Sequence, residues 1–200
     1  AAVATGRLDR IEARAAEAVS GGVPTIWGDE LVLQSVLMVG YPRALTAAAV
    51  WRGATGRPAA SEEDGADSRM QDEWRRRGET ACQTIYGGNY LKLRQNVAAL
   101  HPALDAWMVA EGYGRTLSRP GLDLVRRELC VVAQVLVLEA ERQLHSHLRG
   151  ARNAGATLGA IDEALLRAEC RAATQFTTLM ASAAARRGVS QPVLSRGVSP

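Results

Sequence analysis

Aromatic residues are scarce in this chain, and their scarcity narrows its fold class. Phe, Trp and Tyr together make up 4% of the 200 residues, although 47% of the residues are hydrophobic. The core must therefore consist mainly of Leu, Val, Ile and Ala. Ala and Leu are strong helix formers, whereas strands favour aromatic and β-branched residues. The composition predicts an all-α protein, with enough chain to bury a substantial core.

Long runs of one charge and long apolar runs are both missing. The 24 basic and 21 acidic residues are largely interspersed and give a formal net charge of +3. The densest basic run, Arg75 to Arg77, is flanked by Glu73 and Glu79, as is typical of a solvated helix face. A nucleic-acid-binding domain would need a longer basic stripe, and the apolar run 129–138 is too short to span a bilayer. We therefore expect neither nucleic acid nor a membrane as a partner.

Cysteines are few, and their spacing excludes the usual sulfur-based sites. Cys82, Cys130 and Cys170 lie far apart, with no CxxC pair and no spacing typical of metal ligands. No stretch resembles a signal peptide. These features predict buried, reduced thiols in a cytoplasmic protein. No motif calls for a metal or an organic cofactor, so we expect neither.

Hydrophobic periodicity and capping residues divide the chain into helices. Residues 1–20 have a weak helical pattern. We expect a break at Gly40, with Pro42 opening the next helix. We also expect a loop over 114–121 and an N-cap at Asp123. The remaining helices are predicted over 29–39, 43–52, 70–84, 91–100, 102–112 and 123–154, followed by one capped at Thr157 and an Ala-rich one ending at Gly188.

A segment without apolar periodicity separates the first helices from the rest of the chain. Residues 53–68 contain Gly, Pro, Ser and acidic residues and are typical of a linker or surface loop. We therefore divide the chain into N-terminal helices and linker packing on the body (1–60), a main helical domain (61–188) and a flexible tail (189–200).

The most specific motifs lie in and before the longest apolar-periodic run. They are Tyr86-Gly87 with Asn89-Tyr90, His101-Pro102, Gly112-Tyr113-Gly114-Arg115, Ser118-Arg119-Pro120-Gly121, Arg127-Glu128-Leu129, His147-Leu148-Arg149-Gly150-Ala151 and Asn153-Ala154-Gly155-Ala156-Thr157.

As a set, over residues 70–170, these motifs resemble the carboxymuconolactone decarboxylase and AhpD-like family. The resemblance implies an AhpD-like helical bundle for residues 61–188. It also implies a homo-oligomer, often a trimer or a hexamer. A Gly40-Tyr41-Pro42 turn is similar to one that the family usually has after its core motif, and its place before the core here indicates a rearranged helix order.

In the AhpD branch, the resemblance implies a Glu, a CxxC pair and a His that act together in proton relay and thiol chemistry. Glu128 and His147 fall on the Glu and the His of that pattern, whereas Ala140 and Gln143 stand where the two cysteines would lie. Peroxide reduction needs a thiolate and a resolving thiol, which Ala and Gln cannot supply. The chain therefore lacks a peroxidase's cysteine pair, and Cys130 is expected to be a core residue.

Glu128 and His147 can share one site within the chain only if the long run between them is broken. On an uninterrupted helix they would be about 28 Å apart, at about 1.5 Å per residue. Residues 139–142 form the one polar interruption, so we place a break there. His147 shares its helix face with Gln143 and with small or apolar residues, whereas His145 lies among charged residues. His147 is therefore the better candidate for chemistry.

Both residues also have ordinary structural interpretations. His147 is equally understood as a hydrogen-bonded core histidine. Glu128 follows two arginines near the start of a helix, where the macrodipole favours a carboxylate. If Glu128 instead points inward, it can act as a proton donor or acceptor. The sequence leaves these alternatives open.

Three functions compete on this evidence. The first is a decarboxylase- or isomerase-like enzyme acting on a small carboxylated lactone or a related acid, with proton transfer by Glu128 or His147. The second, a thiol-dependent hydroperoxide reductase, is disfavoured by the absent CxxC. The third is a non-catalytic oligomeric or ligand-binding module. For the enzyme, Arg119 or Arg149 would hold a substrate carboxylate. Further candidates for substrate contact are Tyr113, Gln143 and Trp74.

Overall fold

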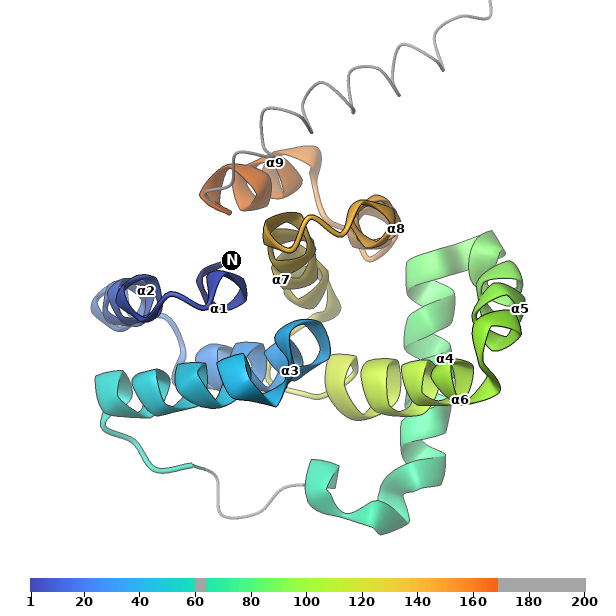
Figure 1. Cartoon of the computed structure of the whole chain (residues 1–200), viewed down its shortest axis with the longest axis horizontal. Coiled ribbons are helices and arrows are strands. Elements are labelled where there is room, and N and C mark those ends of the chain that lie inside the picture. Colours follow the sequence, from blue (N-terminus) through green and yellow to red (C-terminus); the bar gives the residue numbers. More distant parts are fainter. Residues whose placement is uncertain (60–63, 169–200) are drawn as a thin grey trace, which may run out of the picture.

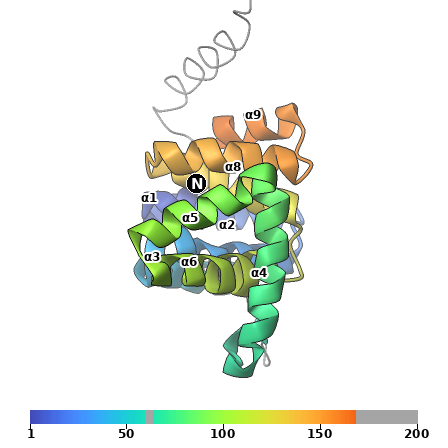
Figure 2. The ribbon, with the colours of Figure 1, turned by 90° about the vertical axis from the view of Figure 1, so that its right-hand side faces the viewer.

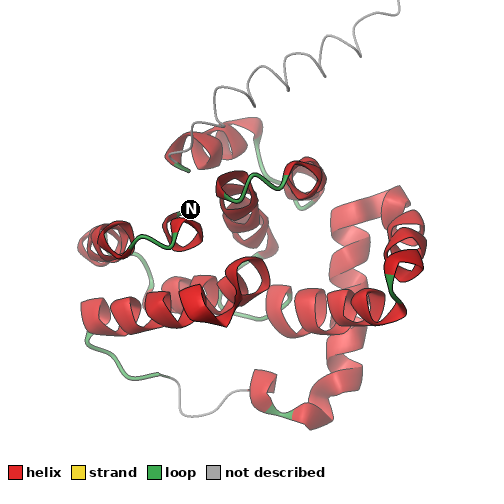
Figure 3. Cartoon of the chain, in the orientation of Figure 1, coloured by secondary structure: helices red, strands yellow, loops and turns green. Residues whose placement is uncertain are grey.

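The computed structural model describes residues 1–59 and 64–168, and every regular element within them is a helix (Figure 3). The all-α prediction is confirmed. The predicted Ala-rich helix ending at Gly188, the predicted tail 189–200 and Cys170 lie outside the described residues. The elements are α1 (Ala2–Thr5), α2 (Leu8–Ser20), α3 (Thr25–Thr55), η1 (Asp64–Ala66), η2 (Ser68–Met70), α4 (Gln71–Tyr86), η3 (Gly87–Asn89), α5 (Tyr90–Leu100), α6 (Pro102–Trp107), η4 (Met108–Leu117), α7 (Leu124–Val137), α8 (Glu141–Asn153) and α9 (Leu158–Arg167).

Helix α7 lies at the centre of this arrangement. It contacts α8 and α9 as well as α1 and α3, and in Figure 1 it lies between these two groups. Asp123 caps its first turn, as predicted, by accepting a hydrogen bond from the Arg126 N–H. Its apolar residues recur at helical spacing and form the main core with aliphatic residues of α4 and α8. The buried members from these three helices include Ile85, Val131, Val132, Val135, Leu136, Leu144 and Leu148.

Helix α4 crosses the continuous α6–η4 helix at very close range (Figure 2). A Cβ atom on Gly78 would lie 2.0 Å from the Val109 carbonyl oxygen, and one on Gly114 would lie 1.8 Å from that of Trp74. No other residue type fits at either position, because any side chain would overlap the opposing backbone. The glycines therefore set the distance between these two helices.

The predicted end of the helix at Gly112 is wrong. A π-helical segment, η4, continues the helix to Leu117, so only the second part of the predicted loop 114–121 is a loop. The sequence does contain the signal, because Val109, Tyr113 and Leu117 recur every four residues and are all buried. The glycines serve close packing here and do not stop the helix.

Helix α3 is kinked at Gly40, where φ is 69° and ψ is 175°. The predicted break at this residue is confirmed. The helix begins earlier and ends later than predicted, at Thr25 and Thr55, and the left-handed residue that stops it is Gly56.

Within the described part of the chain, α3 is also the one helix long and apolar enough to cross a membrane by length and composition. A core helix of a soluble protein passes the same test. Helix α3 packs against α1, α2 and α7, and its Glu30 is buried between two arginines, whereas 22% of its most apolar window is buried.

The chain reverses direction between α7 and α8 within residues 138–140. The Ala140 N–H donates to the Val135 carbonyl and the Glu139 N–H donates to the Leu136 carbonyl, each at 3.0 Å. Glu139 has a φ of 54°, the left-handed conformation that this pattern of hydrogen bonds requires at the end of a helix. The predicted break in the long apolar run is therefore confirmed.

Candidate functional site

The reversal brings Glu128 of α7 against His147 of α8. His147 Nδ1 lies 2.9 Å from Glu128 Oε2, within hydrogen-bonding distance. Glu128 is fully buried, and 7% of His147 is exposed. The interpretation of Glu128 as a surface residue in the first turns of a helix is therefore wrong. The acid and the imidazole form an internal pair within one chain.

Close packing at Gly150 fixes the position of this pair. A Cβ atom on Gly150 would lie 2.6 Å from Glu128 Oε2 and 2.6 Å from Ile85 Cγ2. Both distances are well below an ordinary contact of about 3.5 Å. Glycine at this position thus allows α8 to approach α4 and α7 closely enough for His147 to reach Glu128.

The second oxygen of Glu128 is unsatisfied. Oε1 is buried and has no hydrogen-bond partner among residues 1–59 and 64–168. A buried acceptor without a donor is unfavourable by about 1–3 kcal/mol. This oxygen is therefore a place where a proton, a water molecule or a donor group of a ligand would be stabilised.

Two tyrosines lie close to the pair. The Tyr86 and Tyr113 hydroxyl groups are 2.7 Å apart, and their rings meet edge to face. Burial raises the pKa of Tyr86 to about 12, and the charge of Glu128 adds to this increase. Burial also raises the pKa of Tyr113, and it raises that of the Cys82 thiol to about 12. All three groups keep their protons near neutral pH, so Cys82 is not poised as a thiolate nucleophile.

A cavity of about 230 Å³ adjoins the pair. Ile85 and Tyr86 of α4 form one wall, Arg149 of α8 another, and Lys92 of α5 a third. Within the described residues, neither Lys92 nor Arg149 forms an ion pair or a side-chain hydrogen bond. Two cations without an anionic partner, together with the amide groups of Asn89, Asn96 and Asn153 at the same cavity, suit a small carboxylate.

The cavity and the pair are adjacent but separate. Neither Glu128 nor His147 lines the 230 Å³ cavity. Ile85 lines the 230 Å³ cavity, and its Cγ2 atom lies beside Gly150, where Glu128 Oε2 also lies.

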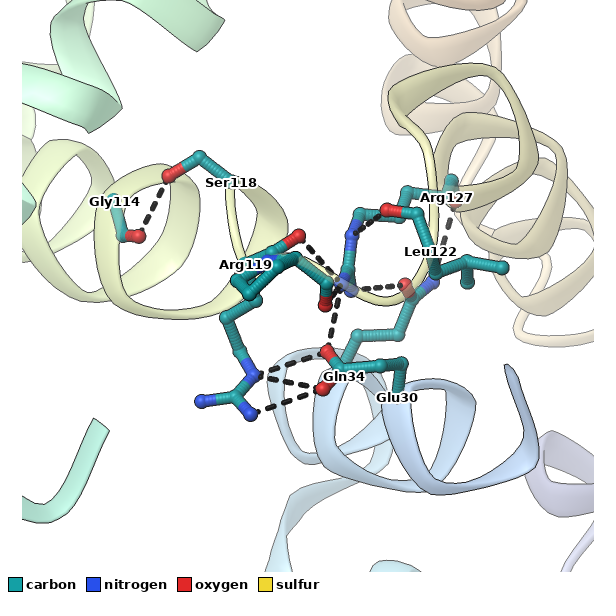
Figure 4. Close-up of polar contacts among 8 residues, drawn as sticks. Glu30, Gln34, Gly114, Ser118, Arg119, Leu122 and Arg127 are labelled. Atoms are coloured by element: carbon teal, nitrogen blue, oxygen red, sulfur yellow. Dashed lines mark hydrogen bonds and ion pairs between the residues drawn. The ribbon is translucent and has the colours of Figure 1, made fainter. Parts of the chain in front are cut away.

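Arg119 binds a carboxylate, but the carboxylate belongs to the protein (Figure 4). Its Nε and Nη2 donate to both oxygens of Glu30 at 2.9–3.2 Å, and Arg127 Nη2 donates to Glu30 Oε2 at 2.6 Å. Arg127 also donates to the Leu122 carbonyl and to the Gln34 amide oxygen. The cluster fastens the loop after η4 to α3. This internal partner corrects the expectation that Arg119 serves a substrate.

Residues 102–188 match the family model described as the Carboxymuconolactone decarboxylase family. This segment is similar to that family. No curated protein and no solved structure gave a significant match to the chain. The matched segment contains α6 to α9, and with them Glu128 and His147, whereas α1 to α5 precede it. The resemblance stated from the motifs is confirmed, and the predicted boundary at residue 61 stays a prediction.

The other predicted contact residues do not converge on the pair. Gln143 is exposed on α8, and Trp74 is buried at the α4–η4 crossing under the Arg115 guanidinium. Tyr113 is buried beside Tyr86. Of the predicted residues, Arg149 lies at the cavity next to the Glu128–His147 pair.

Tyr86 and Lys92 are among the cavity residues that were not predicted as site residues. Tyr86 was available from the Tyr86-Gly87 motif, which is part of the family resemblance. Lys92 gave no signal, because a single lysine on an amphipathic helix is indistinguishable from an ordinary surface residue.

Proposed function

We propose that this carboxymuconolactone decarboxylase/AhpD-like protein is a proton-transfer enzyme acting on a small carboxylated lactone or a related acid. The observation that supports this most is the hydrogen-bonded pair of Glu128 and His147. With His147 Nδ1–H donating a hydrogen bond to Glu128 Oε2, the lone pair of Nε2 is left able to take a proton. A carboxylate held against an imidazole is a common arrangement for general acid–base catalysis.

The substrate carboxylate would bind in the 230 Å³ cavity. Lys92 and Arg149 supply two positive charges there, and Ser146, which also lines it, directly precedes His147 in α8. Movement of Ile85 would join the cavity to the pair. Tyr86, which stays protonated because of its high pKa, is placed to donate a hydrogen bond to the bound ligand.

A second candidate is a ligand-binding module that retains the helical bundle without catalysis. It is favoured by the observation that neither Glu128 nor His147 lines the 230 Å³ cavity. A hydroperoxide reductase is disfavoured, because Ala140 and Gln143 occupy the positions of the cysteine pair and Cys82 is a buried, protonated thiol.

We also propose that the protein is a cytoplasmic homo-oligomer. Leu33, Leu37, Tyr41 and Leu45 of α3 recur every four residues and are exposed, which suits a helix that packs on another copy. Cys82 and Cys130 are free thiols, as expected in a reducing compartment. Light scattering of the purified chain tests the oligomer.

The function is tested by incubating the purified chain with 4-carboxymuconolactone and following lactone loss and release of carbon dioxide. His147→Asn should reduce kcat by about 10²–10⁴-fold, the usual contribution of general acid–base catalysis. Arg149→Met should mainly raise KM. His145→Asn, a change of the same type on the same helix, is the control and should be neutral. No turnover at high enzyme concentration would eliminate this substrate, and an unchanged His147→Asn rate would eliminate the proposed role of the pair.

A further inference from the structure

A larger cavity, of about 480 Å³, lies on the opposite side of the fold from the Lys92–Arg149 cavity, between the N-terminal helices and α7. Its walls are mainly apolar and include Ile11 of α2, Val32 and Trp51 of α3 and Leu129 of α7. It shares no lining residue with the Lys92–Arg149 cavity. Most of its lining comes from α1 to α3, which precede the residues matched by the family model. We therefore treat it as a separate site.

One polar group in this wall lacks a partner. Gln134 lines the cavity and is fully buried, and its Oε1 has no hydrogen-bond partner in the described part of the chain. The orientation of its amide follows from a chain of hydrogen bonds. The Ser35 hydroxyl donates to the Leu31 carbonyl at 2.7 Å, so Ser35 Oγ must accept from Gln134 Nε2, also at 2.7 Å. The remaining Gln134 oxygen can only accept.

The charged side chains at this cavity have partners within the protein. Arg14 pairs with Glu17 at 2.5 Å, Arg167 pairs with Glu163 at 2.9 Å, and Arg126 pairs with Asp123. A ligand with a net charge would therefore gain little here, whereas an apolar ligand would bury its surface against the aliphatic and indole side chains.

We propose that this cavity binds an apolar small molecule with a single hydrogen-bond donor, an O–H or N–H group directed at Gln134 Oε1. The volume lies within the range of small-molecule sites, about 300–1,000 Å³. Trp27 and Trp51 in the wall suit an aromatic body. The donor satisfies the Gln134 side-chain oxygen, which the described part of the wall leaves unpaired.

N-phenyl-1-naphthylamine is a suitable probe, because it has an apolar aromatic body, one N–H group and fluorescence that increases in apolar surroundings. Its N-methyl analogue has the same body without the donor. The full-length chain should bind the N–H probe with one site per chain. Gln134→Met removes the acceptor at similar volume. It should raise the Kd of the N–H probe by about tenfold, because a hydrogen bond to a buried acceptor is lost. Binding of the N-methyl analogue should be the same to both proteins.

A variant that fills the cavity locates the probe. Ala18 lines the cavity, and Ala16, on the same helix, is exposed and does not. Ala18→Phe should abolish probe binding, whereas Ala16→Phe should leave it unchanged, with both variants retaining the helical circular dichroism spectrum.

Several results would overturn the proposal. Absence of binding to the unmodified chain would exclude the site. Equal weakening of both probes by Gln134→Met would exclude the role of the donor. Probe binding that survives Ala18→Phe would place the probe elsewhere. A lower molecular mass of Ala18→Phe in light scattering would mean that a second copy of the chain covers this face. None of these measurements depends on catalytic turnover, so the proposed enzyme function and this site can fail separately.

Discussion

Replacing Gly150 by Ala tests how tightly the Glu128–His147 pair is packed. The added Cβ would lie 2.6 Å from Glu128 Oε2 and 2.6 Å from Ile85 Cγ2. Since an ordinary contact is about 3.5 Å, both groups must move by nearly 1 Å. Overpacking of this kind typically destabilises a protein by about 1–3 kcal/mol. The same movement would lengthen the 2.9 Å contact to His147 and weaken its hydrogen bond.

A matched control separates packing from helix propensity. Gly53 lies in α3, and a Cβ there would meet no atom within 4 Å. Gly53→Ala should stabilise the protein by up to about 1 kcal/mol, because Ala is the better helix former. Gly150→Ala gains the same propensity but adds the overlap, so the two variants should differ by about 1–3 kcal/mol. For a chain of this size, that difference corresponds to roughly 2–12 °C in Tm, at about 2–4 °C per kcal/mol.

Urea denaturation of both variants measures the difference directly, and ¹⁵N NMR of the His147 ring reports the pair. We expect the Nδ1 resonance to shift in Gly150→Ala and to stay unchanged in Gly53→Ala. If Gly150→Ala were as stable as Gly53→Ala, with an unchanged His147 ring, the close packing described above would be refuted.

Three further substitutions test other parts of the structure. Glu30→Ala leaves the guanidinium groups of Arg119 and Arg127 buried without their carboxylate, so it should lower the free energy of unfolding, measured with urea, by about 3–5 kcal/mol. The control, Glu163→Ala, removes an exposed ion pair and should lower it much less. Equal losses in the two variants would contradict the structural role of Glu30. At Glu139 φ is 54°, a left-handed conformation that glycine adopts more easily than other residues. Glu139→Gly should therefore stabilise the fold by up to about 1 kcal/mol, whereas Glu139→Val should destabilise it. The reverse order of urea midpoints would show that the turn has another conformation. Burial raises the pKa of Cys82 from 9.0 to about 12. As pH rises, the unfolded chain therefore loses this proton before the folded protein does. The free energy of unfolding should fall between pH 9 and 12, by at most about 1.4 kcal/mol per pH unit. Cys82→Ala should show a smaller loss over the same pH interval, and identical pH profiles would mean that Cys82 ionises normally in the folded protein.

Much of the fold could be predicted because its helices begin at recognisable residues. Asp123 and Thr157 accept hydrogen bonds from the backbone of the first turn, as their types suggest. Helix ends were harder to locate. The same pair of hydrogen bonds ends α2, α7 and α8, with Gly22 and Gly155 in the left-handed position of α2 and α8 but Glu139 in that of α7. The end of α7 therefore had no glycine to mark it, and only the polar cluster indicated it.

The candidate site was predictable where family motifs identified its residues, as with Glu128 and His147. The partner of Arg119 was not predictable, because Glu30 lies 89 positions away in the sequence. A sequence can show that a guanidinium needs an anion, but it cannot show whether a substrate or a distant side chain provides it. Lys92 was missed for a related reason, since only the packing of α5 near α8 makes it part of the cavity.

The short connection between α7 and α8 has a consequence for how the length of this chain can vary. Each residue inserted into an α-helix rotates everything after it by about 100°. One extra residue in the first turn of α8 would therefore turn His147 away from Glu128, and a deletion would turn it the other way. Residues 57–59, which lie outside every helix, are under no such constraint. Homologous chains should therefore differ in length there and keep a constant spacing from Glu128 to His147, and a functional protein with a single insertion between these two residues would contradict this expectation.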